Sequence, residues 1–234
     1  MRTPRAAALW TAATTSPRAS PSRWKSYCAR SSEWCAPSTN SAIHAATSAA
    51  DWPPSVRVRV VSHGFIESLV RARIGRTFNF YRDGKRAPLL RGRLERYLDE
   101  RAGAAILLVA EAPGYRGTRV SGIPLTSERQ LTGAGPGEAT ATIVHRVLAE
   151  LGMTDDVLLW NAVPTHPGGA RSNRPPSRAE VERGIAYARA LARRRCVVPV
   201  GRVAHAALGG PYVRHPSHGG AAAFAAALRA LLAA

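Results

Sequence analysis

The sequence is poor in acidic residues and in cysteine. Its 234 residues include 15 Asp and Glu against 33 Lys and Arg, which gives a formal net charge of +18. The cysteines, Cys28, Cys35 and Cys196, are too few for a disulfide framework or for the four thiolates of an iron–sulfur cluster. We therefore expect a cytoplasmic protein that holds no metal cluster, metal ion or other cofactor.

A long apolar run is also missing. No stretch of about 18 apolar residues occurs, so we expect no membrane span. The apolar segment 221–234, "AAAFAAALRALLAA", is short and predicts a terminal core helix. Positive charge, in contrast, is abundant, and an excess of this size favours a polyanion such as nucleic acid as the partner. Biased genomic composition and an ordinary solvated surface would give the same charge balance.

The chain divides into two parts of different composition. Residues 1–56 are rich in Ala, Ser, Thr, Pro and Arg and show no sustained hydrophobic period, which predicts a disordered N-terminal extension of low complexity. Its basic, acid-poor composition fits a transit peptide, and a start codon placed too early would explain it equally well. Residues 57–234 have the length of one α/β domain. We expect this domain to be a monomer.

Strand and helix patterns alternate through the second part. Short apolar runs predict strands at 104–110, 156–164, 196–201 and within 211–220. Helical periods predict helices at 65–75, 89–103, 137–152, 177–195, 202–210 and 221–234. Ser177 begins the pattern "SRAE", a capping box that marks a helix start. The alternation predicts a three-layer α/β/α sandwich around a central, mainly parallel, four-stranded sheet.

Polar residues follow three of the predicted strands, in the segments "EAPG" (111–114), "NAVPTHP" (161–167) and "HPSHGG" (215–220). Ligands of parallel sheets bind beyond the carboxyl ends of the strands, so these segments should converge on one pocket. Asn161 is either a turn residue or an amide that offers donor and acceptor to a planar base. His215 is either an ordinary loop histidine or an imidazole aimed at developing negative charge.

Several common sites do not fit these segments. The glycine-rich loop 114–122 has neither the Lys-Ser or Lys-Thr of a phosphate-binding P-loop nor the spacing of a dinucleotide fingerprint. The chain also has no nucleophile elbow and no zinc-deaminase spacing. His215 and His218 lie close in sequence, but a metal site would need further ligands nearby.

The order and spacing of the three segments resemble the uracil-DNA glycosylase superfamily over residues 61–234. "AEAPG" (110–114) resembles the first motif of bacterial family 4 and family 5 enzymes, and "GIPLTSE" (122–128) resembles the segment that follows it. "NAVP" and the later "NRPP" (173–176) resemble the asparagine motif, and "HPS" resembles the second signature. The resemblance implies an enzyme that flips uracil out of DNA and hydrolyses its N-glycosidic bond in base-excision repair.

The resemblance also implies roles for individual residues. Asn161 would read the edge of the base, and His215 would hydrogen-bond the uracil carbonyl and stabilise the leaving anion. Glu111 and Ala112 would hold the attacking water. The remaining assignments are base contacts for Gly114, Tyr115 and Leu125, and DNA contacts for Ser127, Arg174, Ser217 and His218.

This sequence departs from the family pattern at several places, among them Ala110, which replaces the usual first Gly, and His218-Gly219-Gly220, which replaces an apolar wedge. Ala112 stands where the most active relatives have Asp or Asn, so water activation would fall to Glu111, to His166 or to the backbone. Gly114 stands where some relatives have a Tyr that blocks the thymine methyl group, which implies a roomier pocket that admits other deaminated bases. Leu125 stands where relatives have a stacking Phe, and the four cluster cysteines of family 4 are missing.

Three hypotheses therefore remain open. The first is a monofunctional DNA glycosylase that releases uracil. The second is a protein that binds a base or nucleic acid in a glycosylase-like fold without hydrolysis, and Ala112 is its best support. The third is a basic α/β protein that binds nucleic acid through charge alone, with a steep dependence on salt.

Overall fold

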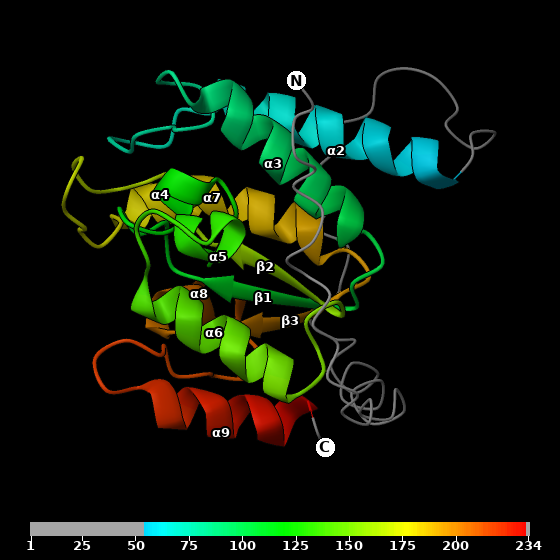
Figure 1. Ribbon diagram of the computed structural model, residues 1–234, viewed down its shortest axis with the longest axis vertical. Helices are drawn as coiled ribbons and strands as arrows, with labels where there is room; N and C mark the ends of the chain where they lie inside the picture. Colours follow the sequence, from blue (N-terminus) through cyan, green and yellow to red (C-terminus); the bar gives the residue numbers. More distant parts are fainter. Residues whose placement is uncertain (1–53, 233–234) are drawn as a thin grey trace.

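The computed structural model describes residues 54–232, with side chains from residue 63 onward. The extension expected at residues 1–56 therefore lies, up to residue 53, outside the described residues, as do Cys28 and Cys35. Helix α2 (Pro54–Arg71) begins at the first described residue. Figure 1 shows helices above and below a central sheet, which confirms the predicted three layers.

The sheet is parallel, with the order β2-β1-β3. Strand β1 (Ile106–Ala110) lies between β2 (Val157–Asn161) and β3 (Cys196–Pro199). Strand β1 is buried along its whole length, as its uninterrupted apolar sequence predicts, because helices cover both faces. The pairing register places Ala110 beside Asn161, so the polar segments after β1 and β2 begin side by side.

Side chains of the strands alternate between two hydrophobic clusters. Ile106, Leu108 and Ala110 pack with α6 (Ala139–Glu150) and α9 (Ala221–Leu232) on one face of the sheet. Leu107 and Val109 pack on the other face with α2, α3 (Ala87–Glu100), α7 (Arg178–Ala192) and α8 (Arg202–Leu208). This alternation is the two-residue period of a strand. The clusters fix the sheet, and thereby the places where the strands end.

The predicted fourth strand is wrong. Within the described residues the sheet has three strands, and segment 211–220 contributes one isolated parallel bridge, between Val213 and Val200. Pro211 and Pro216 lack the N–H groups that a longer ladder needs, and Gly209 and Gly210 turn the chain at positive φ just before it. The single bridge still sets the segment beside β3, so His215 lies near the end of the sheet.

Two short helices were missed in the long loop after β1. They are α4 (Thr118–Ser121) and α5 (Glu128–Thr132), each closed by a left-handed glycine, Gly122 and Gly133. The predicted capping box of α7 is confirmed, because the Ser177 hydroxyl accepts a hydrogen bond from the backbone N–H of Glu180. Helices this short carry too little periodicity to be recognised from sequence.

Candidate active site

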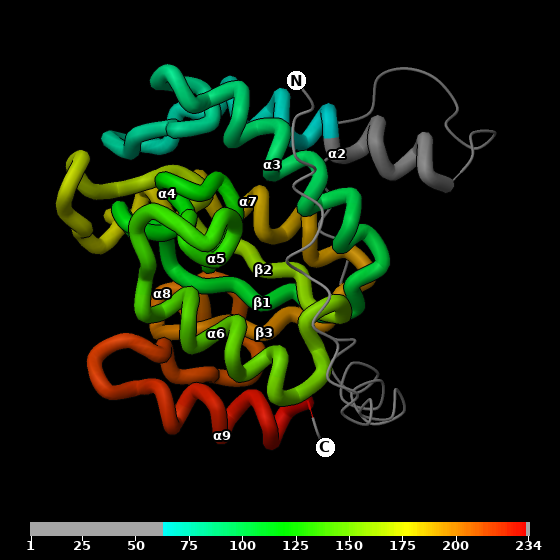
Figure 2. The backbone as a smooth tube through the Cα atoms, viewed as in Figure 1, coloured from blue at the N-terminus to red at the C-terminus, as the bar shows by residue number. Residues whose placement is uncertain are grey.

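The candidate site lies where the three parallel strands end. Figure 2 shows loop 164–177 (yellow) and the loop after Val213 (orange-red) on the same side of the molecule, beyond these strand ends. Hydrogen bonds continue the strand pairing into the loops, from Val163 N–H to the Glu111 carbonyl (3.0 Å) and from Val200 N–H to the Val109 carbonyl (2.7 Å). The segments that carry Glu111, Asn161 and His215 therefore lie at the same edge of the sheet.

Asn161 is the last residue of β2, and its side chain is buried, with an exposed fraction of 2%. Neither Oδ1 nor Nδ2 has a hydrogen-bond partner within the described part of the chain. Leaving buried polar atoms unpaired costs about 1–3 kcal/mol per group. A fold that tolerates this cost at a strand end holds a donor and an acceptor ready for a ligand.

His215 is half-buried beside Gly201, the residue at which the chain leaves β3. Gly201 has φ +85°, and a Cβ atom there would lie 3.3 Å from the Cβ of His215, so the close approach favours glycine. The backbone N–H of Ser217 donates to Nδ1 of His215 at 3.2 Å, and the Ser217 hydroxyl lies 2.7 Å from the same nitrogen. Because an N–H can only donate, Nδ1 must be the acceptor, and the proton of the neutral ring lies on Nε2.

Burial, and to a smaller extent the neighbouring His218, lowers the pKa of His215. The imidazole is therefore neutral at pH 7. Its free Nε2–H can donate to a carbonyl oxygen that gains negative charge. His218 itself is exposed at the tip of the loop, with φ +50°, followed by Gly219 at φ +74°.

Glu111 directly follows β1 and is half-buried. Its carboxylate forms no ion pair or hydrogen bond with the residues that the structure describes, and burial raises its pKa. An unpaired, partly desolvated carboxylate at a strand end is a candidate general base. The neighbouring Ala112 has no polar side chain, so Glu111 is the only acidic residue in "EAPG".

His166 was a second candidate for activating water, but its ring is already occupied. The side chain is fully buried, with Nδ1 2.7 Å from the Pro113 carbonyl and Nε2 2.9 Å from the Gly169 carbonyl. The backbone N–H of Tyr115 donates to Oδ1 of Asn173 at 2.9 Å. These contacts fasten the glycine-rich loop to loop 164–177, so His166 positions the site instead of facing it.

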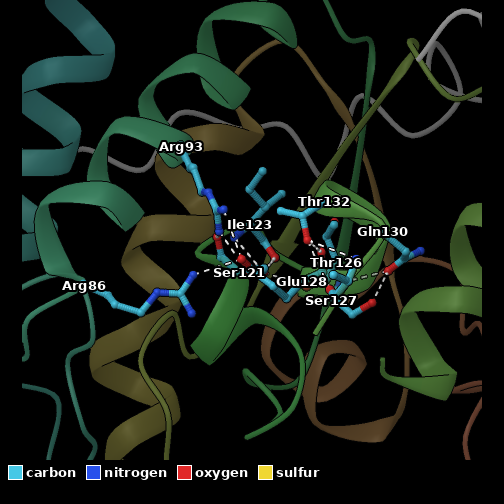
Figure 3. Close-up of polar contacts among 10 residues, drawn as sticks. Arg86, Arg93, Ser121, Ile123, Thr126, Ser127, Glu128, Gln130 and Thr132 are labelled. Atoms are coloured by element: carbon cyan, nitrogen blue, oxygen red, sulfur yellow. Dashed lines mark hydrogen bonds and ion pairs between the residues drawn. The ribbon is translucent and has the colours of Figure 1, made fainter. Parts of the chain in front are cut away.

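The segment between α4 and α5 is held against α3 (Figure 3). Arg93 donates to both carboxylate oxygens of Glu128, at 2.8 and 3.1 Å, and Arg86 donates to one of them at 3.0 Å. Burial acts to raise the pKa of Glu128, but the hydrogen bonds and charges of these two arginines outweigh it, so the pKa is lowered. The carboxylate stays ionised and anchors the loop that carries Leu125 and Ser127.

Leu125 and Ser127 are both buried in this segment. Leu125 has φ +51°, which strains a residue with a branched side chain, and its side chain packs in the core cluster of α6 and α9. Ser127 has an exposed fraction of 1%, and its hydroxyl lies 2.9 Å from Oε1 of Gln130 in the capping box of α5. Their proposed contacts with base and phosphate stay predictions.

Arg174 already has a partner. Its guanidinium donates to both oxygens of Glu180, at 2.8 and 2.7 Å. That pairing, opposed by burial but helped by the N–H groups of Ser177 and Arg76, lowers the pKa of Glu180 to about 2. A phosphate contact by Arg174 also stays a prediction, since the side chain now ties the start of α7 to the chain before it.

One carboxylate near the site was missed. Glu138 precedes α6, and its carboxyl oxygens lie against the Cα atoms of Gly114 and Gly117. Nothing in "GEATAT" marks this residue, because only the fold brings it to a loop more than 20 residues earlier. Two glycines three residues apart were the available signal, since they leave room for a side chain from elsewhere.

Comparison with known proteins agrees with this geometry. The model of the uracil DNA glycosylase superfamily matches residues 99–231, more than half of the chain. The chain therefore belongs to the uracil DNA glycosylase superfamily, whose members are in general DNA glycosylases that act on DNA. The match covers all three strands and all three polar segments. No curated protein matches the chain.

No group of three or more His, Cys, Asp or Glu side chains within residues 54–232 could hold a metal ion. None of the helices in this range is long and apolar enough to span a bilayer.

Proposed function

We propose that the protein is a monofunctional DNA glycosylase that hydrolyses the N-glycosidic bond of uracil in DNA, in base-excision repair. The observation that carries this proposal is the Asn161 amide, buried without a partner at the edge where the strands end. Uracil offers an acceptor, O4, beside a donor, N3–H, and one side-chain amide can satisfy both. In a duplex the uracil base is paired and stacked, so the nucleotide must first rotate out of the stack to reach this amide.

His215 supplies the second element. When the bond between C1′ of the sugar and N1 of uracil breaks, the base leaves with the electron pair and its carbonyl oxygen gains negative charge. The neutral imidazole donates through Nε2–H to that oxygen, because Ser217 occupies Nδ1. A donor aimed in advance at developing charge stabilises the transition state more than the bound substrate.

Glu111 supplies the third element. Positive charge develops on the sugar as the base leaves, and a carboxylate nearby stabilises it and accepts a proton from the water that adds to C1′. The products are free uracil and an abasic sugar. A lyase step would need an amine nucleophile; the one lysine in the described range, Lys85, is exposed before α3, which supports a monofunctional enzyme.

The alternative is a protein that binds a flipped base without hydrolysis. Ala112 favours it, because no polar side chain at this position holds water. The two functions differ in product. We would incubate the purified protein with oligonucleotides that carry U:G, U:A or single-stranded U, and then reveal abasic sites with alkali. Strand scission after alkali supports the glycosylase, whereas retention of uracil DNA without scission at stoichiometric protein supports the binding protein.

A further inference from the structure

Glu138 lies on the same face of the sheet as the side chain of Asn161. Val157 and Leu159 of β2 pack in the core cluster that contains α6, and strand alternation puts Asn161 on that face too. Helix α6 runs antiparallel to the strands, so its first turn lies at their carboxyl ends (Figure 1). Glu138 is the residue directly before this turn and therefore lies at the edge that holds the candidate site.

The carboxyl group of Glu138 fills the space beside two glycines of the loop after β1. A Cβ atom built on Gly114 would overlap Oε1 of Glu138, and one built on Gly117 would overlap Oε2. Neither glycine has a positive φ. The end of the Glu138 side chain therefore occupies the room that a side chain at either position would take.

The carboxyl group has no hydrogen-bond or ion-pair partner in residues 54–232, and burial raises its pKa. The contacts that anchor this loop elsewhere, through His166 and Asn173, do not involve it. A partly buried carboxyl that stabilises neither the loop nor its own helix by a hydrogen bond is a poor structural element and a candidate for contact with substrate.

A uracil glycosylase also needs a group that rejects thymine, which differs from uracil by one methyl group and is far more abundant in DNA. Asn161 reads the O4 and N3–H edge, and His215 reads a carbonyl oxygen, and both features are common to the two bases. Neither residue can therefore discriminate between them. The discriminating group must meet the ring edge that carries the methyl group.

We propose that Glu138 is the residue that determines base specificity: its carboxyl group occupies the space beside Gly114 and excludes a base that is larger than uracil by a methyl group. This inference rests on the proposed function and names how that site selects its substrate. The room expected from Gly114 is thus filled by a side chain from another element. One methyl group in a close-fitting pocket changes selectivity by about 10–200-fold.

The test compares thymine with uracil excision from G mispairs by the full-length protein and its variants. The ratio of kcat/KM for thymine to that for uracil should rise at least about tenfold in Glu138→Ala. It should stay near the starting value in Glu138→Gln, which keeps the size of the side chain. Glu182→Ala, an exposed glutamate on α7 (61% exposed), is the matched control and should leave the ratio unchanged.

A second measurement checks the geometry directly. The Cβ of Gly114→Ala lies where the carboxyl end of Glu138 now lies, so the effects of Gly114→Ala and Glu138→Ala on the melting temperature should not be additive in the double variant. Additive effects of the two substitutions would show that the side chains do not share this space, which would overturn the proposal.

The outcomes separate this inference from the proposed function. An unchanged ratio in Glu138→Ala, or an equal rise in Glu138→Gln, would overturn the specificity role while uracil excision stands. Oligonucleotides with 2′-fluoro-2′-deoxyuridine or its 5-methyl counterpart resist hydrolysis and report binding alone. If the protein releases no base but prefers the unmethylated analogue, and Glu138→Ala loses that preference, the specificity role stands and the proposed hydrolysis fails.

Discussion

The backbone N–H of Ser217 donates to Nδ1 of His215 at 3.2 Å, which leaves Nε2 to carry the proton of the neutral ring. Removing that donor in His215→Ala should lower kcat/KM for uracil about 10²–10³-fold, the usual effect of losing one donor to an oxyanion. Ser217→Ala keeps the backbone N–H and should cost only a few-fold. Single-turnover excision assays measure both effects.

A histidine far from the strand ends serves as the control. His63→Ala removes an exposed imidazole on α2 and should leave excision unchanged. Nitrogen NMR shifts of the free protein should show His215 protonated at Nε2 alone near pH 7. A ring protonated at Nδ1, or equal activity in the His215→Ala and His63→Ala variants, would show that His215 does not act on the leaving base.

Asn161→Leu should raise the stability of the protein and lower its activity. The amide is buried without partners in the described range, so an apolar side chain of similar size removes an uncompensated desolvation cost. We expect the free energy of unfolding to rise by about 1 kcal/mol and kcat/KM for uracil to fall at least about 100-fold. Denaturant unfolding and excision assays check the two parts. A less stable variant that keeps its activity would contradict the role of Asn161 as a reader of the base.

Glu111 predicts an acid limb in the pH profile of kcat/KM. Burial raises the pKa of this carboxyl, and the ionised form is the active one, so activity should rise with pH through a value above the ordinary glutamate pKa of 4.5. Above that pH the activity should be level. Glu111→Gln should lower the plateau and abolish this limb. A limb that persists unchanged in Glu111→Gln would assign the titration to another group.

The ion pair between Arg174 and Glu180 should make the free energy of unfolding depend on pH in the acid range. The folded-state pKa of Glu180 is depressed to about 2, so its stabilisation is present above the ordinary pKa of 4.5 and is lost as pH falls from there toward 2. Arg174→Met leaves the buried carboxylate with only the N–H groups of Ser177 and Arg76 as partners and should cost about 1–3 kcal/mol at pH 7. The cost should nearly vanish at pH 2. Urea unfolding at both pH values measures it.

DNA binding by the same variant tests the other role of Arg174. If the residue is structural, Arg174→Met should leave the slope of log binding constant against log salt unchanged in the folded protein. A phosphate contact would reduce that slope by about one.

Much of the fold could be predicted because the relevant signals are local. Uninterrupted apolar runs marked β1, β2 and β3, and the capping box at Ser177 marked the start of α7. The prediction of a fourth strand failed because an extended segment between prolines looks like a strand in sequence, although it lacks N–H donors for a ladder. The number of strands depends on pairing partners, which one segment does not reveal.

The candidate site was predicted only in part, for a similar reason. Asn161 ends β2, and His215 follows the single bridge beside β3, so both lie at the edge where a parallel sheet gathers polar residues. The ring of His166 is occupied by the carbonyl of Pro113 from a distant segment, and Arg174 is occupied by Glu180, a pairing that no local pattern indicated. Glu138 depends on the packing of α6 against the loop after β1, and a glycine in sequence does not tell which side chain fills its space.

The most direct measurement follows the base itself. A uracil-containing oligonucleotide is incubated with excess protein in a single turnover, and mass spectrometry identifies the products. We expect free uracil and an intact strand with one abasic site from the wild-type protein, and almost none of either from His215→Ala. Unaltered DNA after prolonged incubation with the wild-type protein, or the same product yield from both proteins, would contradict the proposed hydrolysis.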